Sequence, residues 1–268
     1  MPLASLFDRK RLALHRARAR AHFSAHDVLF REAAGLLSDR LSDISRSFPL
    51  ALNIGPGSVD IEGRVERWER ADAACFEEAG LPFEDDRFDL VASAGGLHWV
   101  NDLVGALMQI RRMLKPDGLF LALLPGPQTL RELRASFEQA ELDLKGGISP
   151  RISPFVEVRD AGNLLARAGF ALPVADSELF SLAYDSPLAL MQDLRGMGEA
   201  NALAASVKHF TPRAVFERMA AHYAEHFARS DGKIAASFEC VGLTGWKPHE
   251  SQQKPAKRGS GKIHLSEI

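Results

Sequence analysis

A short apolar run that ends in a glycine turn constrains the fold of this chain most. The run Leu50–Ile54 follows Pro49 and leads directly into Gly55-Pro56-Gly57. A short run of this kind, with Leu50, Ala51, Leu52 and Ile54 as its apolar members, is typical of a parallel strand that is buried on both faces. Glycines after such a strand allow a tight turn and let a ligand approach the backbone closely. The stretch therefore predicts a buried strand, followed either by a ligand-binding turn or by an ordinary strand-ending turn.

Further strand-sized apolar runs alternate with amphipathic helical patterns along the rest of the chain. Strands are predicted at 88–96, 118–126, 174–186 and 234–247, and helices at 12–47, 102–114, 127–147, 156–169, 187–196 and 212–228. Pro116 is expected to stop the helix at 102–114, and Asp117-Gly118 to form a turn. This alternation predicts an α/β fold: an open sheet with helices on both faces and a far edge that is not simply parallel.

The length and composition indicate one large domain with extensions. The chain has 268 residues, of which 46% are hydrophobic and 25% charged, as in an ordinary globular protein. We expect a helical N-terminal extension over 1–47, the α/β domain over 48–248, and a polar, lightly packed tail over 249–268.

Several classes of function are disfavoured by composition. The formal net charge of −2 gives no reason to expect a nucleic-acid partner. Cys75 and Cys240 are far apart and form no Cys-x-x-Cys motif, so neither a disulfide framework nor a metal site is predicted. The longest apolar runs are too short to cross a bilayer, so no integral membrane segment is predicted. The basic stretch 8–23 favours a surface helix over a transit peptide, which predicts a cytoplasmic protein with the mitochondrial matrix as the alternative.

Three segments resemble, in order, the core motifs of class I S-adenosylmethionine (SAM)-dependent methyltransferases. They are "LALNIGPG", "LPFEDDRFDLVASAGGLHWVNDL" and "LMQIRRMLKPDGLFLALL", and they are similar to the branch that includes the malonyl-carrier methyltransferase of biotin synthesis. A narrower resemblance is to the complex I assembly factor 5 family. It is carried by "LHWVNDL", "GMGEAN" and "GWKPHESQ" and runs over nearly the whole chain. These resemblances imply a Rossmann-like methyltransferase sheet and SAM as the cofactor.

The methyltransferase resemblance also implies where SAM would be held at the start of the domain. Gly55 and Gly57 fall on the family's glycine turn, which faces the methionine part of SAM. Asn53 stands where the family usually has Asp, so a charge is lost while a hydrogen-bonding side chain is kept. The acid before the "LPF" motif, which begins at Leu81, marks the adenine-facing turn. By count this acid is Glu77, or Asp72 if the loop is longer.

The strand predicted at 88–96 supplies the remaining expected cofactor-binding residues. Ser93 and Gly95 lie at its carboxyl end, which faces the transferable methyl group in the family, and His98 follows on the next turn. His98 is also a weak candidate for a general base, although a histidine that only begins a helix is the simpler interpretation. Trp99 is expected to pack in the core more than to stack on a cofactor.

The region between the glycine turn and Arg87 departs from the family pattern because it is short. Roughly thirty residues must replace two crossovers, although a single βαβ unit normally takes about thirty. We expect one strand within "RVERWERAD" and a turn or short helix, so the sheet is truncated near its first two crossovers. The ribose-binding acid therefore stays open, and the candidates are Asp60, Glu62 and Glu66.

Three functions are compatible with the sequence. The first is SAM-dependent methyl transfer to an unidentified small molecule or protein. The second follows from the narrower family, whose mitochondrial members are linked to complex I assembly and to hydroxylation of an arginine on a partner subunit. An iron–sulfur subunit of complex I is then the expected partner, recognised by "GGISPRISPF" (146–155) and "GMGEAN" (196–201). The third is a non-catalytic binding module that has lost SAM binding.

Overall fold

A computed structural model describes residues 5–59, 63–77, 83–207 and 210–253. One six-stranded sheet runs through it in the order β2-β1-β3-β4-β6-β5. Its strands are β1 (Phe48–Ile54), β2 (Val65–Ala71), β3 (Phe88–Ala94), β4 (Leu114–Pro125), β5 (Ala171–Tyr184) and β6 (Ile234–Trp246). The first four strands are parallel, whereas β6 is antiparallel to both β4 and β5. This order confirms the predicted Rossmann-like sheet and its antiparallel far edge.

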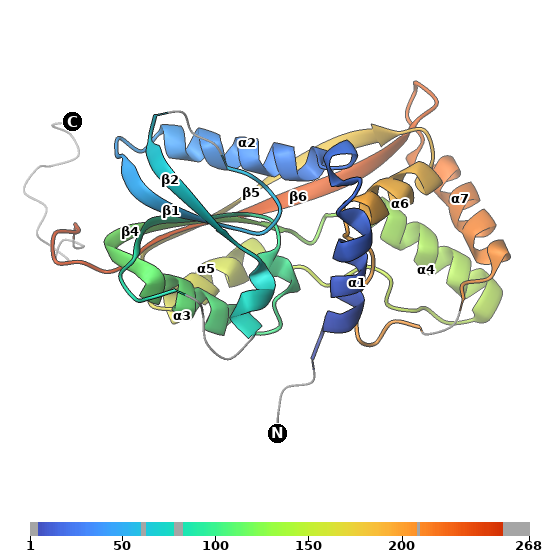
Figure 1. The fold of residues 1–268 in the computed structure, drawn as a ribbon. Coiled ribbons are helices and arrows are strands. Elements are labelled where there is room, and N and C mark those ends of the chain that lie inside the picture. Colours follow the sequence, from blue (N-terminus) through green and yellow to red (C-terminus); the bar gives the residue numbers. More distant parts are fainter. Residues whose placement is uncertain (1–4, 60–62, 78–82, 208–209, 254–268) are drawn as a thin grey trace, which may run out of the picture.

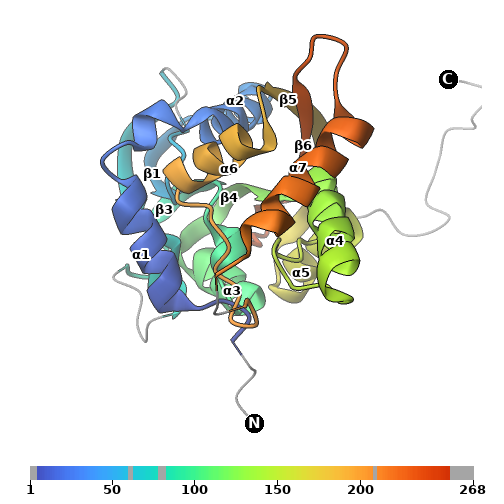
Figure 2. The same ribbon diagram turned by 90° about the vertical axis from the view of Figure 1, so that its right-hand side faces the viewer.

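Helices cover both faces of the sheet and gather at one end (Figure 1). They are α1 (Arg9–Ala19), α2 (Val28–Ser42), α3 (Leu103–Met113), α4 (Arg131–Lys145), α5 (Val158–Arg167), α6 (Pro187–Gly196) and α7 (Arg213–Phe227). Apolar residues of α2 pack on one face, and those of α3 and α5 pack on the other. A third apolar cluster joins α4, α6 and α7 to β6, and Figure 2 shows these three helices together. Parallel strands covered on both faces explain why β1 and β3 are mostly apolar.

The helical pattern predicted over 12–47 is divided between two helices. The segment divides into α1 and α2, with a 3₁₀ turn at Phe23–Ala25 between them. The side chain of Asp8 accepts a hydrogen bond from the backbone N–H of Arg11 and so caps α1. Only α2 packs on the sheet, whereas α1 lies against residues 72–74, which directly follow β2.

The helix predicted at 102–114 is confirmed to within one residue at each end, whereas the turn predicted at Asp117-Gly118 lies inside a strand. α3 ends at Met113, and β4 begins at Leu114 and runs through Pro116 in extended form. The register of β4 against β3 shifts at this point, because several extra residues bulge out before Leu119 pairs with Leu90. A proline is tolerated at such a bulge because its missing N–H removes no ladder hydrogen bond.

The shortened region has the form that its length predicts. Residues 55–64 join β1 to β2, and the described part of this connection contains no helix. A 3₁₀ helix at Ala73–Glu77 follows β2. Among the described residues no strand pairs with the outer side of β2, which therefore forms one edge of the sheet. The prediction of one strand and a short helix here is confirmed.

Candidate functional site

The glycine turn after β1 packs directly on the turn after β3. Gly55 has a φ of 95°, and a Cβ placed on it would collide with the carbonyl oxygen of Gly95. A Cβ on Gly57 would lie 2.5 Å from the carbonyl oxygen of Ala94. Glycine is therefore required at both positions because two backbone segments meet there. The space that these glycines open is filled by the chain itself.

Two more of the expected cofactor-binding residues are buried beside this turn. Asn53 is 2% exposed, and its Nδ2 donates to the carbonyl of Gly57 at 2.7 Å. Its Oδ1 is buried, and no hydrogen bond reaches it from the described part of the chain. Ser93 is fully buried, and its Oγ donates to the carbonyl of Ile54 at 2.9 Å, which ties β3 to β1. Asn53 Oδ1 is thus the free acceptor of this region.

Of the acids considered for SAM, Asp72 lies at the carboxyl end of β2. Its Oδ1 accepts from Arg16 Nη1 of α1 at 2.7 Å and from the backbone N–H of Ala74 at 2.9 Å. A cavity of about 200 Å³ lies between α1 and residues 72–74, and Arg9, Arg16 and Arg20 line it. Asp72 therefore lies both at the carboxyl end of β2 and on the wall of this cavity.

The other acids of that region are placed less favourably or not at all. Glu66 is exposed near the amino end of β2, which is the opposite end of the strand from the glycine turn. Glu77 is the last residue of the 3₁₀ helix that follows β2. Asp60, Glu62 and Leu81 lie outside the described residues, as does the predicted tail from residue 254 onward.

A larger cavity, of about 340 Å³, lies at the carboxyl ends of β3 and β4, beside β6. Most of its wall is apolar, with Phe137, Phe180 and Phe238 among the lining side chains. The predicted substrate-side segments both reach it, the first at 151–155 and the second at 199–201. Its charged or polar lining residues include His98, Arg151, Glu199, Asn201 and Glu239. This size suits a small ligand or one long side chain.

Glu199 is the most tightly held carboxylate on the cavity wall. Its Oε2 accepts from His98 Nε2 at 2.9 Å and from Trp99 Nε1 at 2.8 Å. Burial would raise the pKa of Glu199, but attraction to His98 and the hydrogen bond from His98 outweigh burial and hold that pKa below its usual range. Glu199 is therefore an ionised carboxylate in apolar surroundings.

His98 and Trp99 both lie on cavity walls, and both make contacts that hold the local structure. His98 lines the larger cavity, and its Nδ1 lies 3.3 Å from the backbone N–H of Gly96. Trp99 is 7% exposed, and its ring packs edge-on against Phe7 at 5.0 Å between centroids. Trp99 also lines both cavities, so one side chain separates the Asp72 region from the Glu199 region.

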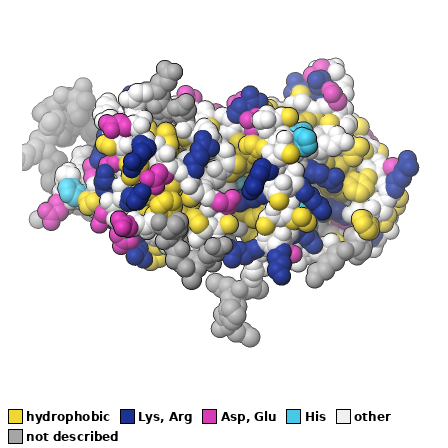
Figure 3. All heavy atoms as spheres, viewed as in Figure 1, with side chains coloured by type: hydrophobic (Ala, Val, Ile, Leu, Met, Phe, Trp, Pro, Cys, Tyr) yellow, Lys and Arg dark blue, Asp and Glu magenta, His cyan; other side chains and the backbone are white. Residues whose placement is uncertain are grey.

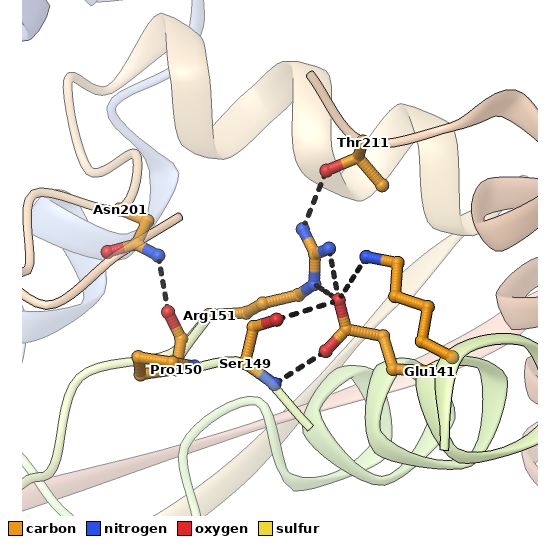
Figure 4. A network of polar contacts seen from close by, with 7 residues as sticks. Glu141, Ser149, Pro150, Arg151, Asn201 and Thr211 are labelled. Atoms are coloured by element: carbon orange, nitrogen blue, oxygen red, sulfur yellow. Dashed lines mark hydrogen bonds and ion pairs between the residues drawn. The ribbon is translucent and has the colours of Figure 1, made fainter. Parts of the chain in front are cut away.

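A second buried carboxylate fixes the roof of the larger cavity (Figure 4). Glu141 of α4 is 1% exposed and accepts from Arg151 at 2.5 Å, from Lys145 at 3.1 Å and from the backbone N–H of Ser149 at 2.7 Å. Burial would raise the pKa of Glu141, but these bonds lower it to about 2. Arg151 also donates to Thr211 at 3.0 Å. The network therefore pins the segment 146–155 to α4.

The two substrate-side segments also touch each other. Asn201 Nδ2 donates to the carbonyl of Pro150 at 3.0 Å, a contact that Figure 4 shows beside the Glu141 network. The guanidinium of Arg151 lies 4.6 Å from the ring centroid of Phe137, which lines the same cavity. The polar network thus continues from α4 to the segment that carries Glu199.

Comparison with known proteins identifies the family. Residues 50–122 match the model of the methyltransferase domain family. "Arginine-hydroxylase NDUFAF5, mitochondrial" of Danio rerio is 40% identical over 98% of this chain and 89% of its own length. The Homo sapiens protein of the same name is 38% identical over 98% of this chain and 83% of its own length. This chain belongs to the arginine-hydroxylase NDUFAF5 family. Both predicted resemblances are confirmed, since a malonyl-[acyl-carrier protein] O-methyltransferase of Methylovorus sp. (strain MP688) is also 37% identical over 69% of this chain and 60% of its own.

Sequence reasoning overlooked three carboxylates of the site. Glu199 lies in the predicted segment "GMGEAN", but the sequence assigns it no role of its own. Glu141 and Glu239 lie outside every predicted site. Glu239 is 9% exposed within β6, and its Oε2 accepts from the backbone N–H of Gln128 at 2.8 Å. An acid inside the apolar run "IAASFECVGL" was the one available signal, because buried acids in strands need partners.

Two further features bear on function: metal-binding groups and membrane-spanning helices. Those residues include no group of three or more His, Cys, Asp or Glu side chains placed to hold a metal ion. No described helix is both long enough and apolar enough to cross a membrane.

Proposed function

We propose that this chain modifies an arginine side chain of a protein partner in the larger cavity, as the name of its relatives indicates. The observation that carries the proposal is Glu199, an ionised carboxylate on the wall of a mostly apolar cavity, whose other charged lining residues include Arg151 and Arg195. Both hydrogen bonds to Glu199 end on Oε2, and none reaches Oε1 from the residues that the structure describes. One oxygen therefore stays available to a cation entering the cavity.

An arginine side chain matches both properties of this cavity. Its methylene groups bury favourably against apolar walls, while its guanidinium needs a carboxylate partner when it leaves water. His98 and Trp99 hold Glu199 in one orientation, so the carboxylate is preorganised before an arginine arrives. Glu239, on the wall contributed by β6, offers a second negative group to the same cavity.

We further infer that the chain binds SAM at the neighbouring carboxyl ends of β1 and β2. Asn53 Oδ1, buried without a partner, would accept from the amino group of the methionine part. Asp72, beside the 200 Å³ cavity, would hold the ribose hydroxyls after Arg16 gives way. The glycine turn itself would not contact SAM, because the backbone of Ala94 and Gly95 fills the space beside it. Its role is to set the course of the chain between Asn53 and β2. When bound, SAM supplies an electrophilic methyl group on a sulfonium.

Methyl transfer is the second candidate function, and one observation favours it. Trp99 lines both cavities, so a cofactor near Asp72 and a substrate near Glu199 would be neighbours across this side chain. A carboxylate beside a substrate cation would orient it for either reaction. The group found on the modified arginine, an oxygen atom or a methyl group, therefore distinguishes hydroxylation from methylation.

For the partner and compartment, we propose an arginine-bearing iron–sulfur subunit of respiratory complex I, on the family resemblance. The Danio and human relatives are named as mitochondrial proteins. The proposal accordingly extends to the mitochondrial matrix, or to the cytoplasm of a bacterial cell.

The test is mass spectrometry of complex I subunits from cells that lack their own family member. Reintroducing this chain should add one oxygen atom to a specific arginine, and Glu199→Gln should abolish the addition. Glu217→Gln is the matched control, because Glu217 is 62% exposed and forms an ion pair with Arg213 on the same helix, away from the cavity. A methyl group in place of oxygen would establish the second candidate. An unmodified arginine beside a fully assembled complex I would contradict both and indicate a non-catalytic assembly role.

A further inference from the structure

The shortened region leaves β2 as an edge strand with an unusual order of charges. Its central residues read Glu66, Arg67, Trp68, Glu69, Arg70. If two such strands lie antiparallel about Trp68, Glu66 faces Arg70 of the other copy and Arg67 faces Glu69. Every charge in the stretch then meets its opposite, and Trp68 lies beside its own counterpart. The strand is complementary to itself.

The backbone of β2 permits this register. The amide of Phe48 in β1 donates to the carbonyl of Arg64 at 2.6 Å. Because backbone groups alternate sides along a strand, the even-numbered residues of β2 direct theirs to β1 and the odd-numbered ones toward the open edge. Pairing about Trp68 places Arg67 opposite Glu69, and both are odd-numbered residues, whose backbone groups point to the open edge. The two copies would thus exchange hydrogen bonds between groups that already point outward.

The opposite edge of the sheet lacks this complementarity. The charged residues of β5 are Asp176 and Glu178, and both are acidic. Antiparallel pairing of β5 with itself would bring acids together, which is destabilising. Pro173 also removes a donor from this strand. Asp176 is already paired with Arg40 at 2.5 Å. Of the two sheet edges, β2 is the one suited to a second copy.

We propose that two copies of this chain associate through β2, antiparallel about a two-fold axis at Trp68, and so join their six-stranded sheets into one. Figure 3 shows basic and acidic side chains interleaved on the part of the surface above β2. Arg67 is 68% exposed, whereas Glu69 is 25% exposed and also binds Arg87 at 2.7 Å. Glu66 and Arg70 are both exposed, and Arg70 Nη2 donates to Ser58 Oγ at 2.6 Å. Pairing with Glu66 of the second copy exchanges that one hydrogen bond, and symmetry forms the pair twice.

The affinity of this dimer should come mainly from the shared backbone ladder. Exposed ion pairs contribute at most about 1 kcal/mol each, so their main effect is to select the register. Charged edge strands ordinarily prevent association, but they do so when the facing charges repel. Here the order of signs makes the facing charges attract. The dimer needs no residue of either cavity, so it stands independently of the proposed function.

Analytical ultracentrifugation of the full chain over a range of concentrations tests the proposal. The wild type should show a reversible monomer–dimer equilibrium. Glu66→Arg alone, and Arg70→Glu alone, should each raise the dissociation constant at least tenfold, because each places like charges opposite one another twice. An equimolar mixture of the two single variants should recover the dimer, since each reversed charge then meets its opposite.

The double variant Glu66→Arg/Arg70→Glu should also dimerise, and Arg213→Glu on α7 should change nothing. Circular dichroism and thermal unfolding would verify that each variant is folded. A wild type that stays monomeric at all concentrations would overturn the proposal. So would a dimer that survives both single variants, or a mixture that fails to recover.

Discussion

The two halves of the sheet have changed in opposite directions from the methyltransferase pattern. In the half formed by β1 and β2, crossovers are missing, and the glycine turn rests on the backbone of β3. In the half formed by β4, β6 and the inserted helices, a cavity of about 340 Å³ is roofed by polar networks. The first half retains the glycine turn, which is the most recognisable motif in the sequence. The second half contains Glu199, the residue on which the proposed function depends. A glycine motif thus reports descent more directly than ligand binding.

The networks of the second half give the largest expected effect. Glu141→Ala should lower the free energy of unfolding by about 3 kcal/mol, because it leaves the guanidinium of Arg151 without its buried partner. Urea unfolding would measure the loss. Asp143→Ala on the same helix is the control and should cost much less, because its pair with Arg218 is exposed to solvent. Equal losses would show that the Glu141 network carries no special weight.

The first half should respond to added side-chain volume even when no ligand is present. Gly55→Ala should cost about 2 to 3 kcal/mol, since the new Cβ meets the carbonyl of Gly95 at a positive φ. Gly63→Ala is the matched control. Gly63 also has a positive φ but nothing within 4 Å of an added Cβ, so about 1 kcal/mol of strain is expected. Unchanged stability in Gly55→Ala would mean that the turn is an open cradle.

The pH dependence of stability sharpens the same comparison with a smaller effect. The pKa of Glu141 is lowered from 4.5 to about 2 in the folded protein. A lowered pKa contributes stability that is fully present above the unfolded value and is lost as the pH falls toward the folded value. The stability difference between wild type and Glu141→Gln should therefore shrink between about pH 4.5 and pH 2. A constant difference across this window would contradict the network's ionic character.

The smallest expected effect concerns the contact of α1 with Asp72. Arg16→Gln removes the ion pair at 2.7 Å and frees the Asp72 carboxylate. If SAM binds there, its affinity should rise a few-fold, while unfolding changes by less than 1 kcal/mol because Asp72 is 61% exposed. Calorimetric titration with SAM measures the affinity. An Asp72→Asn variant that binds as tightly as the wild type would remove Asp72 from the cofactor site.

Local patterns in the sequence predict most of the sheet but not the contacts that define the cavity. β1 and β3 follow from short, mostly apolar runs, and α4 from its periodicity and the closing Gly146. β4 was predicted to start too late, because the pattern before Leu119 is that of a turn and only pairing with β3 makes it a strand. The meeting of His98 with Glu199 spans 101 residues, and no spacing rule announces it.

The shortening between the glycine turn and β3 also limited what the sequence could assign. Counting back from the "LPF" motif favoured Glu77, with Asp72 as the alternative. The count assumes a loop of ordinary length, whereas β2 ends at Ala71 and places Asp72 directly at its carboxyl end. Strand pairing, which fixes that end, depends on the register between β1 and β2 and is not a local property.

The central claim is that Glu199 receives a guanidinium in the larger cavity. Its most direct test compares the affinity of this chain for two versions of a partner peptide. One contains the target arginine, still unmodified, and the other carries citrulline, an uncharged isostere, at that position. The wild type should bind the arginine peptide at least tenfold more tightly, and Glu199→Gln should bind the two alike. Equal affinities for the wild type, or discrimination that survives in Glu199→Gln, would contradict the claim.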